Sequence, residues 1–185
     1  MANTLLVYAT TDGHTRKISQ RLQEVMEAGG DAVTVLPIGE AQSIDLTGYE
    51  KIVIGASIRY GKHAREVTDF IARNLEQLRS RPSAFFSVNL VARKPEKDQP
   101  DTNPYVRRFL RKIPWKPVYV AVFAGRLDYP RYTPLDRWII RMIMWITRGP
   151  TNPTAIVEFT DWAKVDAFGR RLAVLTTRAE RGGIQ

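Results

Sequence analysis

The chain has 185 residues, 44% of them apolar, which is enough to bury one hydrophobic core of substantial size. It contains no cysteine and two histidines, so disulfides, thiolate catalysis and cysteine-based metal sites are excluded and a structural zinc site is disfavoured. The net charge is +9, and residues 91–148 supply most of it, with thirteen Lys or Arg against five Asp or Glu. This segment favours an anionic partner, such as nucleic acid, lipid headgroups or an acidic small molecule, over an ordinary solvated surface.

Short apolar runs alternate with stripes of apolar residues at helical spacing. In chain order, the pattern predicts strands at 4–9, 32–36, 51–56, 84–91 and 118–124, with helices at 18–26, 67–78 and 162–175. Continuous apolar strands separated by helices predict a parallel sheet that is covered on both faces. Residues 91–116 and 126–160 exceed what such a sheet needs. We expect them to be two insertions that carry the specificity of a single domain, 1–185.

Three loops follow strands whose carboxyl ends meet at one edge of the predicted sheet, which is where ligands bind in this class of fold. Residues 10–15 place three threonines and a glycine before a helix, and a helix N-terminus suits a phosphate group. Residues 57–61 bring Arg59 and Tyr60 to the same edge, and residues 87–97 are polar and basic. Together these loops resemble the flavin mononucleotide (FMN) site of flavodoxins, whose doubly wound α/β sheet has the strand order 2-1-3-4-5.

Each loop is also compatible with a structural role alone, as a helix cap, a turn or a buried strand end. Asp12 departs from the flavodoxin pattern, where a hydroxyl residue is usual, and we expect its carboxylate to point away from a phosphate. No Gly-x-Gly-x-x-Gly or Walker motif follows the first strand, which disfavours nicotinamide dinucleotide and P-loop folds. A phospho-acceptor receiver domain needs acidic residues at the end of that strand, and none is present there.

A basic and apolar helical segment, at about 126–148, is unusual for a soluble domain. Arg137, Arg141 and Arg148 fall on one stripe, and most residues around them in 135–148 are large and apolar, including two tryptophans. A helix of this length is too short to cross a bilayer, but it fits an element that lies among lipid headgroups. The alternative is a helix that is buried in the core or in a dimer contact.

A second part of the segment 91–148 has the same combination of basic and apolar residues. Residues 105–112 are basic and apolar as well, so we expect the whole segment 91–148 to face an anionic membrane surface. No secretory signal and no apolar run of the roughly 20 residues that cross a bilayer is recognisable. We therefore expect a cytoplasmic protein that associates peripherally with the inner face of the cell membrane.

Three stretches of sequence carry a resemblance to a known family. They are Ile-Gly-Ala-Ser-Ile-Arg-Tyr-Gly at 54–61, the segment 82–97, and Tyr-Pro-Arg-Tyr at 129–132 followed by Asp136 and Arg137. In these stretches, and over nearly its whole length including both insertions, the chain resembles the bacterial menaquinone-dependent protoporphyrinogen IX dehydrogenases. The resemblance implies an FMN enzyme of haem biosynthesis that oxidises protoporphyrinogen IX to protoporphyrin IX and passes electrons to a membrane quinone.

The resemblance also implies roles for individual residues. The FMN phosphate is expected at Thr10, Thr11, Gly13, His14 and Thr15. The flavin ring is expected at Ser57, Ile58, Arg59, Tyr60, Gly61, Ser87, Asn89, Leu90 and Val91. The two propionates of the substrate are expected at Arg59, Arg93, Lys94, Arg126 and Arg131. No side chain stands out as an obligate acid or base, and no metal site is expected.

Other functions remain open at this point. An electron carrier of the flavodoxin type is one, although such carriers are typically acidic whereas this chain is basic. An FMN-dependent NAD(P)H quinone reductase is another. A nucleic-acid-binding module is a third, but the basic residues are mixed with large aliphatic ones and no nucleic-acid-binding motif is present, so no nucleic-acid partner is expected. A homo-oligomer is compatible with the sequence.

Overall fold

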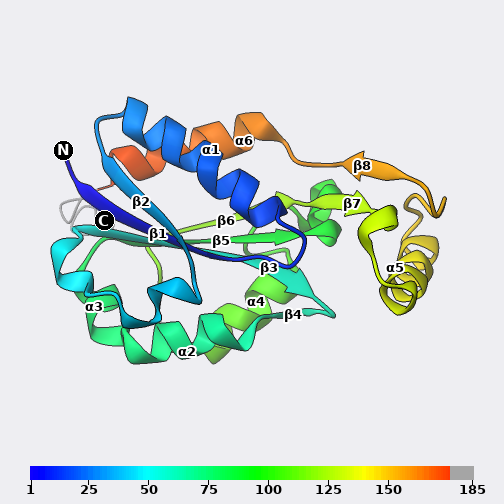
Figure 1. The fold of residues 1–185 in the computed structure, drawn as a ribbon, viewed down its shortest axis with the longest axis horizontal. Coiled ribbons are helices and arrows are strands. Elements are labelled where there is room, and N and C mark those ends of the chain that lie inside the picture. Colours follow the sequence, from blue (N-terminus) through cyan, green and yellow to red (C-terminus); the bar gives the residue numbers. More distant parts are fainter. Residues whose placement is uncertain (176–185) are drawn as a thin grey trace.

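The computed structural model describes residues 1–175 of the chain, and a five-stranded parallel sheet forms its centre (Figure 1). The parallel strands are β1 (Asn3–Ala9), β2 (Ala32–Pro37), β3 (Lys51–Arg59), β5 (Ser83–Asn89) and β6 (Tyr119–Ala124). They lie in the order β2-β1-β3-β5-β6, which is the predicted 2-1-3-4-5 order of the five parallel strands. The predicted flavodoxin-like fold is thus confirmed. A short strand, β4 (Lys62–His63), pairs antiparallel with the end of β3.

Helices cover both faces of the sheet, as continuous apolar strands require. On one face lie α1 (His14–Ala28) and α6 (Trp162–Ala173), and on the other lie α2 (Arg65–Arg73), α3 (Leu75–Ser80) and α4 (Pro104–Lys112) (Figure 1). Successive residues of a strand point to opposite faces. Val53 accordingly packs in the cluster under α1 and α6, whereas Ile52 and Ile54 pack with Phe70 and Trp115 on the other side.

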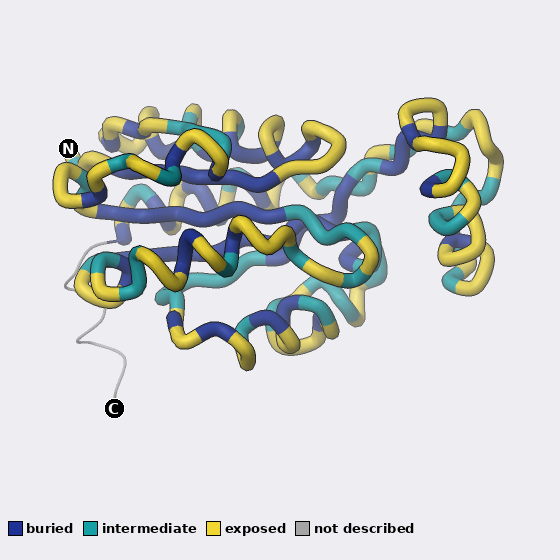
Figure 2. Tube along the Cα trace, turned by 60° about the horizontal axis from the view of Figure 1, so that its bottom comes forward, coloured by how far each residue is buried: buried dark blue, intermediate teal, exposed yellow. Residues whose placement is uncertain are grey.

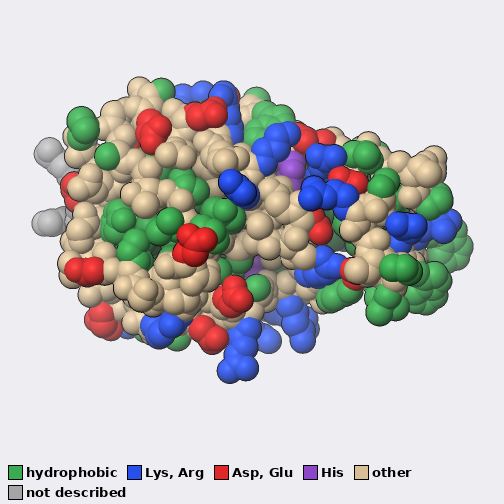
Figure 3. All heavy atoms as spheres, viewed as in Figure 1, with side chains coloured by type: hydrophobic (Ala, Val, Ile, Leu, Met, Phe, Trp, Pro, Cys, Tyr) green, Lys and Arg blue, Asp and Glu red, His purple; other side chains and the backbone are tan. Residues whose placement is uncertain are grey.

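A separate lobe, which we call the α5 lobe, projects beyond the carboxyl ends of the strands (Figure 2). It consists of β7 (Arg126–Asp128), β8 (Ile156–Glu158), which pairs antiparallel with β7, and α5 (Pro134–Ile146) between them. Leu127, Tyr129, Tyr132 and Met144 form its small core. Apolar side chains also gather on the outer side of this lobe, and Lys and Arg side chains lie near its junction with the sheet (Figure 3).

Several element boundaries differ from the predicted ones. The expected helix at 67–78 is two helices, α2 and α3, because the chain breaks at Asn74, whose side chain donates a hydrogen bond to the carbonyl of Phe70. Strand β3 continues to Arg59 because β4 pairs with its end. Asp161 accepts the capping bond at the start of α6. The short strands β7 and β8 were not predicted.

Five 3-10 turns complete the secondary structure of residues 1–175, at Glu40–Ser43, Leu46–Gly48, Leu90–Arg93, Pro95–Lys97 and Tyr129–Arg131. The turn at Leu90–Arg93 replaces the last part of the strand expected at 84–91. Within the described residues, no helix has the length and apolar character that a bilayer crossing would need. The assignment of 91–116 and 126–160 as insertions in a single domain, with a basic and apolar helical segment at about 126–148, stays a prediction.

Candidate functional site

A cavity of about 460 Å³ lies between the carboxyl ends of the strands and α5, a volume in the range of small-molecule sites. Most of the residues predicted to bind cofactor line it, namely Thr10, Thr11, His14, Thr15, Ser57, Ile58, Arg59, Tyr60, Gly61, Asn89, Leu90 and Val91. Of the residues predicted to bind substrate, Arg59, Arg93 and Arg126 line it, whereas Lys94 and Arg131 do not. Gly13 and Ser87 are also outside the lining.

The loop after β1 ends in a helix start whose polar groups are open to a ligand. Gly13, at the N-cap of α1, has φ of +82°, a conformation that favours glycine, and its amide donates to the hydroxyl of Thr10 at 3.0 Å. No side chain caps α1 and no acidic residue lies in its first turn. The buried hydroxyl of Thr15 has no hydrogen-bond partner among residues 1–175. A free helix N-terminus beside an unpaired hydroxyl suits an anion.

His14 joins this loop to a distant part of the chain. Its Nε2 lies 2.6 Å from Oγ1 of Thr160, and that hydroxyl donates to the carbonyl of Ala124 at 2.7 Å. Because the hydroxyl hydrogen is already used, His14 donates its Nε2–H to Thr160. Burial lowers the pKa of His14, so the neutral ring is favoured. His14 therefore fixes the start of α1 against the end of β6.

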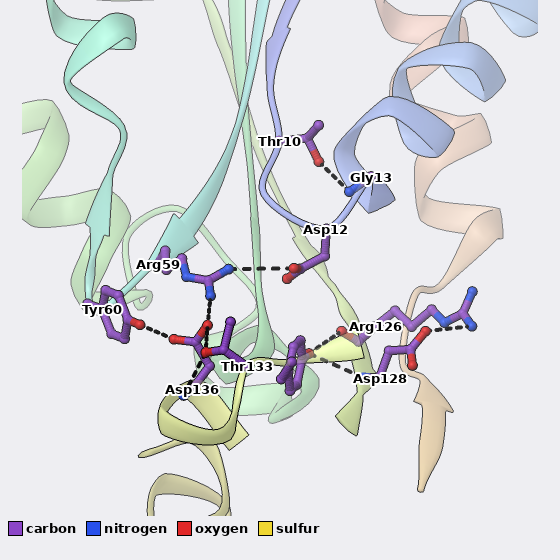
Figure 4. A network of polar contacts seen from close by, with 10 residues as sticks. Thr10, Asp12, Gly13, Arg59, Tyr60, Arg126, Asp128, Thr133 and Asp136 are labelled. Atoms are coloured by element: carbon purple, nitrogen blue, oxygen red, sulfur yellow. Dashed lines mark hydrogen bonds and ion pairs between the residues drawn. The ribbon is translucent and has the colours of Figure 1, made fainter. Parts of the chain in front are cut away.

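In the loop after β3, the polar groups of the Arg59 and Tyr60 side chains are held in an ionic network (Figure 4). The guanidinium of Arg59 contacts the carboxylate of Asp136 and lies 3.5 Å from the carboxylate of Asp12. Tyr60 donates its hydroxyl hydrogen to Asp136, and Thr133 donates to the same carboxylate at 2.8 Å. These hydrogen bonds, with that of Tyr60 foremost, lower the pKa of the buried Asp136.

Arg126 is also paired with a carboxylate. Its Nη2 lies 3.0 Å from Oδ2 of the buried Asp128. Within the described residues, Nε of Arg126 and Oδ1 of Asp128 have no hydrogen-bond partner. The hydroxyl of Tyr132 accepts from the amide of Asp128 at 3.2 Å. The predicted substrate residues Arg59 and Arg126 therefore both have anionic partners within the protein.

Arg93 lines the cavity in a different environment. Its guanidinium donates to the carbonyl and hydroxyl oxygens of Thr147, at 3.0 and 2.8 Å, and to the carbonyl of Leu90 at 3.0 Å. All three acceptors are neutral. Burial lowers the pKa of Arg93, because its charge is partly removed from water.

One side of α5 closes the cavity, which the sequence pattern did not reveal. Ile139, Ile140, Ile143 and Met144 line it. Sequence reasoning missed these residues because the helix is apolar on most of its surface, so periodicity alone does not select an inner face. Val88, Tyr105, Gly125 and Tyr132 were missed as well, and Asp12 was noted only as a departure from the flavodoxin pattern.

The outer side of α5 is exposed. Trp138 and Trp145 are 63% and 75% exposed, and Leu135 and Ile146 are each 66% exposed. Of the three arginines of the predicted basic stripe, Arg137 and Arg141 lie on α5. Arg148 lies beyond the end of the helix and has φ of +55°. An exposed apolar surface of this kind marks an interaction site more often than an isolated exposed side chain does.

Taken together, the cavity is lined by the uncapped N-terminus of α1, by polar loops at the ends of β3 and β5, and by apolar side chains of α5. These features suit a ligand with a phosphate, and a flat apolar ligand beside it. In residues 1–175, no cluster of three or more His, Asp or Glu side chains is arranged to hold a metal ion.

Comparison with known proteins gives two consistent results. A family model described as "Flavodoxin domain" matches residues 5–154. The chain is 42% identical to the protoporphyrinogen IX dehydrogenase (quinone) of Escherichia coli strain K12 over 175 aligned residues. This alignment covers 95% of this chain and 97% of the Escherichia coli protein. It is also 42% identical to the protein of the same name from Leishmania major over 172 aligned residues. This alignment covers 92% of this chain and 74% of the Leishmania major protein.

Solved structures show the same fold at low sequence identity. A flavodoxin from the domain Archaea is 15% identical, with a TM-score of 0.51 over 92% of this chain and 96% of that one. The rubredoxin:oxygen oxidoreductase of Desulfovibrio gigas is 10% identical, with a TM-score of 0.51 over 97% of this chain and 36% of that one. At these identities the likeness concerns the fold alone.

Proposed function

The chain belongs to the protoporphyrinogen IX dehydrogenase (quinone) family of flavodoxin-domain proteins, and from that membership we propose its function. It is an oxidoreductase that uses FMN to oxidise protoporphyrinogen IX to protoporphyrin IX in haem biosynthesis and passes the electrons to a quinone. The observation that carries this proposal is the identity of 42% over 95% of the chain. The unmatched 5% is too short to contain the α5 lobe, so the match extends into this lobe.

The residues at the start of α1 fit the FMN phosphate. The unpaired hydroxyl of Thr15, the open helix N-terminus and the αL conformation of Gly13 provide donors and space for an anion. Thr10, Thr11 and His14 complete the predicted set. Asp12 does not oppose this assignment, because its carboxylate is turned toward Arg59 (Figure 4).

The loops at the ends of β3 and β5 would hold the flavin ring. Residues 57–61 and 89–91 line the cavity next to the phosphate end. When bound, FMN supplies the hydride and electron transfer that the amino acids lack. The protein's part is to orient the ring and to exclude water. Ser87, which we predicted at the ring, is outside the cavity lining, and its hydroxyl lies 2.9 Å from Nε2 of His63.

The apolar side chains of α5 would hold the tetrapyrrole. Ile139, Ile140 and Ile143 offer a surface on which a flat, hydrophobic macrocycle can lie, with basic groups at the rim for its propionates. The conversion is a six-electron oxidation, and each quinone accepts two electrons. We propose no acid or base among the side chains.

We further propose that the outer side of α5 binds an anionic membrane surface, where a quinone is available. The exposed Trp138 and Trp145 suit the headgroup region, and the exposed Arg141 and Arg148 lie near them. Tryptophan prefers this region because its ring is apolar and its N–H is polar. A membrane-bound acceptor next to the cavity would then need no soluble carrier.

Turnover of protoporphyrinogen IX by the FMN-loaded protein tests the function. The reaction is followed anaerobically by porphyrin fluorescence, with and without a menaquinone analogue, and the protein without FMN is the control. We expect porphyrin formation that depends on both FMN and quinone. FMN binding without such turnover would contradict the proposal. If NADH or NADPH reduced the flavin stoichiometrically instead, a quinone reductase would be favoured.

A further inference from the structure

We propose that Arg93 is the residue that binds a carboxylate of the substrate, and that this contact makes the cavity selective for the free acid over the ester of the macrocycle. The proposal rests on the proposed function for the identity of the substrate. It singles out one of the five basic residues that the sequence suggested for this role.

The other two arginines of the cavity lining are already neutralised. Arg59 contacts Asp136 and Asp12, and Arg126 contacts Asp128. A substrate carboxylate at either arginine would lie close to an internal carboxylate, and for Asp136 and Asp128 that group is buried. Like charges repel strongly where water is excluded, so these arginines are poor sites for a second anion.

Arg93 has no such partner. Within residues 1–175 it forms no ion pair, and its hydrogen bonds go to neutral oxygens of Leu90 and Thr147. A guanidinium that is half-buried beside an apolar wall, without a counter-charge, favours an anionic ligand, because charge–charge attraction is stronger where water is excluded.

The guanidinium is also held in place before any ligand binds. Its contacts with Leu90 and Thr147 fix it between the turn after β5 and the end of α5. Gly149 leaves the necessary space, because a Cβ at this position would lie 3.0 Å from Nη2 of Arg93 and 2.4 Å from the sulfur of Met144. A fixed guanidinium loses little conformational freedom when it binds a carboxylate.

Binding of the stable product tests the proposal without turnover. The FMN-loaded protein is titrated with protoporphyrin IX and, in the same detergent, with its dimethyl ester, and the two dissociation constants are measured by fluorescence. The variants are Arg93→Gln and Arg93→Lys. The matched control is Arg81→Gln, because Arg81 is also half-buried and donates to a backbone carbonyl, that of Leu46 at 2.7 Å, but lies outside the cavity lining.

We expect the wild type and Arg81→Gln to bind the free acid more tightly than the ester. Arg93→Gln should lower this preference by about tenfold or more, as for a lost charge-assisted hydrogen bond, with little change for the ester. Arg93→Lys should retain part of the preference. Equal weakening for acid and ester in Arg93→Gln would show a structural role and overturn the proposal, as would a wild type without preference.

The outcome for Arg93 is separable from that for the proposed function. A wild type that oxidises the porphyrinogen with quinone but binds acid and ester equally would retain the function and overturn the role of Arg93. A wild type without turnover whose preference for the acid depends on Arg93 would overturn the function and leave Arg93 as a carboxylate-binding residue.

Discussion

The guanidinium of Arg59 contacts the carboxylate of Asp136, a residue 77 positions later in the chain. This contact joins the hairpin of β3 and β4 to the first turn of α5 (Figure 4). Tyr60, which has φ of +49°, donates to the same carboxylate. A strained backbone conformation is retained where surrounding contacts fix it. Here the contacts of Arg59 and Tyr60 with Asp136 hold Tyr60 in its left-handed conformation.

The contact predicts that Asp136 positions α5. Replacing Asp136 with Asn removes the charge that pairs with Arg59, so α5 should open more often from the cavity. Hydrogen exchange followed by mass spectrometry should show several-fold faster exchange in residues 133–147, with the central strands unchanged. Asp166→Asn is the matched control, since Asp166 pairs with Arg21 at 2.7 Å between α1 and α6. Unchanged exchange in α5 of the Asp136 variant would refute this role.

The phosphate assignment predicts a role for the Thr15 hydroxyl. Thr15→Val keeps the shape of the side chain but removes a hydrogen bond to a charged group, so FMN should bind about 10- to 100-fold more weakly. Flavin fluorescence measures this affinity. Ser19→Ala is the control, because the hydroxyl of Ser19 already donates to the carbonyl of Thr15 within α1 at 2.9 Å. Equal losses in both variants would point to damage to the helix instead of a lost phosphate contact.

The sequence predicted the sheet well because its signal is local. Each central strand is a continuous apolar run between turn residues, and the order of the strands was expected from the resemblance of the three loops to a flavodoxin site. The break between α2 and α3 was missed because Val67, Phe70, Leu75 and Leu78 keep an apolar stripe across it. Strands β7 and β8 have three residues each, too few for an alternating pattern to be recognised.

The site was less predictable because its charges pair over long distances. The residues that approach the cavity follow from the rule that parallel strands place ligand loops at their carboxyl ends. Nothing in the sequence indicates that Arg59 is paired with Asp136 and that Arg93 has only neutral partners. The difference between these two arginines arises only when α5 folds back over the strand ends.

The half-buried His63 predicts a pH dependence of stability. Its ring packs 4.4 Å from that of Phe109, and burial lowers its pKa from 6.5 to about 3. Between these values the unfolded chain binds a proton that the folded chain does not, so stability is complete above pH 6.5 and falls as the pH is lowered toward 3. From pH 6.5 to 5, this costs about 2 kcal/mol of unfolding free energy.

The variant His63→Gln isolates this contribution. Glutamine does not titrate and can still bond to Ser87, while His14 remains in both proteins. Urea unfolding at pH 7 and pH 5 should therefore show a smaller loss of stability on acidification in the variant than in the wild type, by about 2 kcal/mol. An equal loss in both proteins would mean that His63 is not held neutral by the fold.

The exposed side of α5 predicts binding to anionic vesicles. Replacing Trp138 and Trp145 with Ser removes two large apolar surfaces from the headgroup region and should reduce co-sedimentation with vesicles that contain anionic lipid by at least about tenfold. Trp162→Phe is the control, because Trp162 lies on α6 and bonds to Glu158. Turnover with a water-soluble quinone analogue should be unchanged in the double variant, since neither tryptophan lines the cavity.

The charge of the same surface predicts a dependence on lipid composition. Each exposed arginine near an anionic bilayer contributes about 1 kcal/mol, so Arg141→Gln together with Arg148→Gln should weaken binding to anionic vesicles by about 30-fold at physiological ionic strength. Binding to neutral vesicles should change little, and added salt should reduce the difference because it screens exposed charges. If wild-type protein bound anionic and neutral vesicles equally, the arginines would have no role in docking, and the tryptophan variant would then decide whether α5 binds the membrane at all.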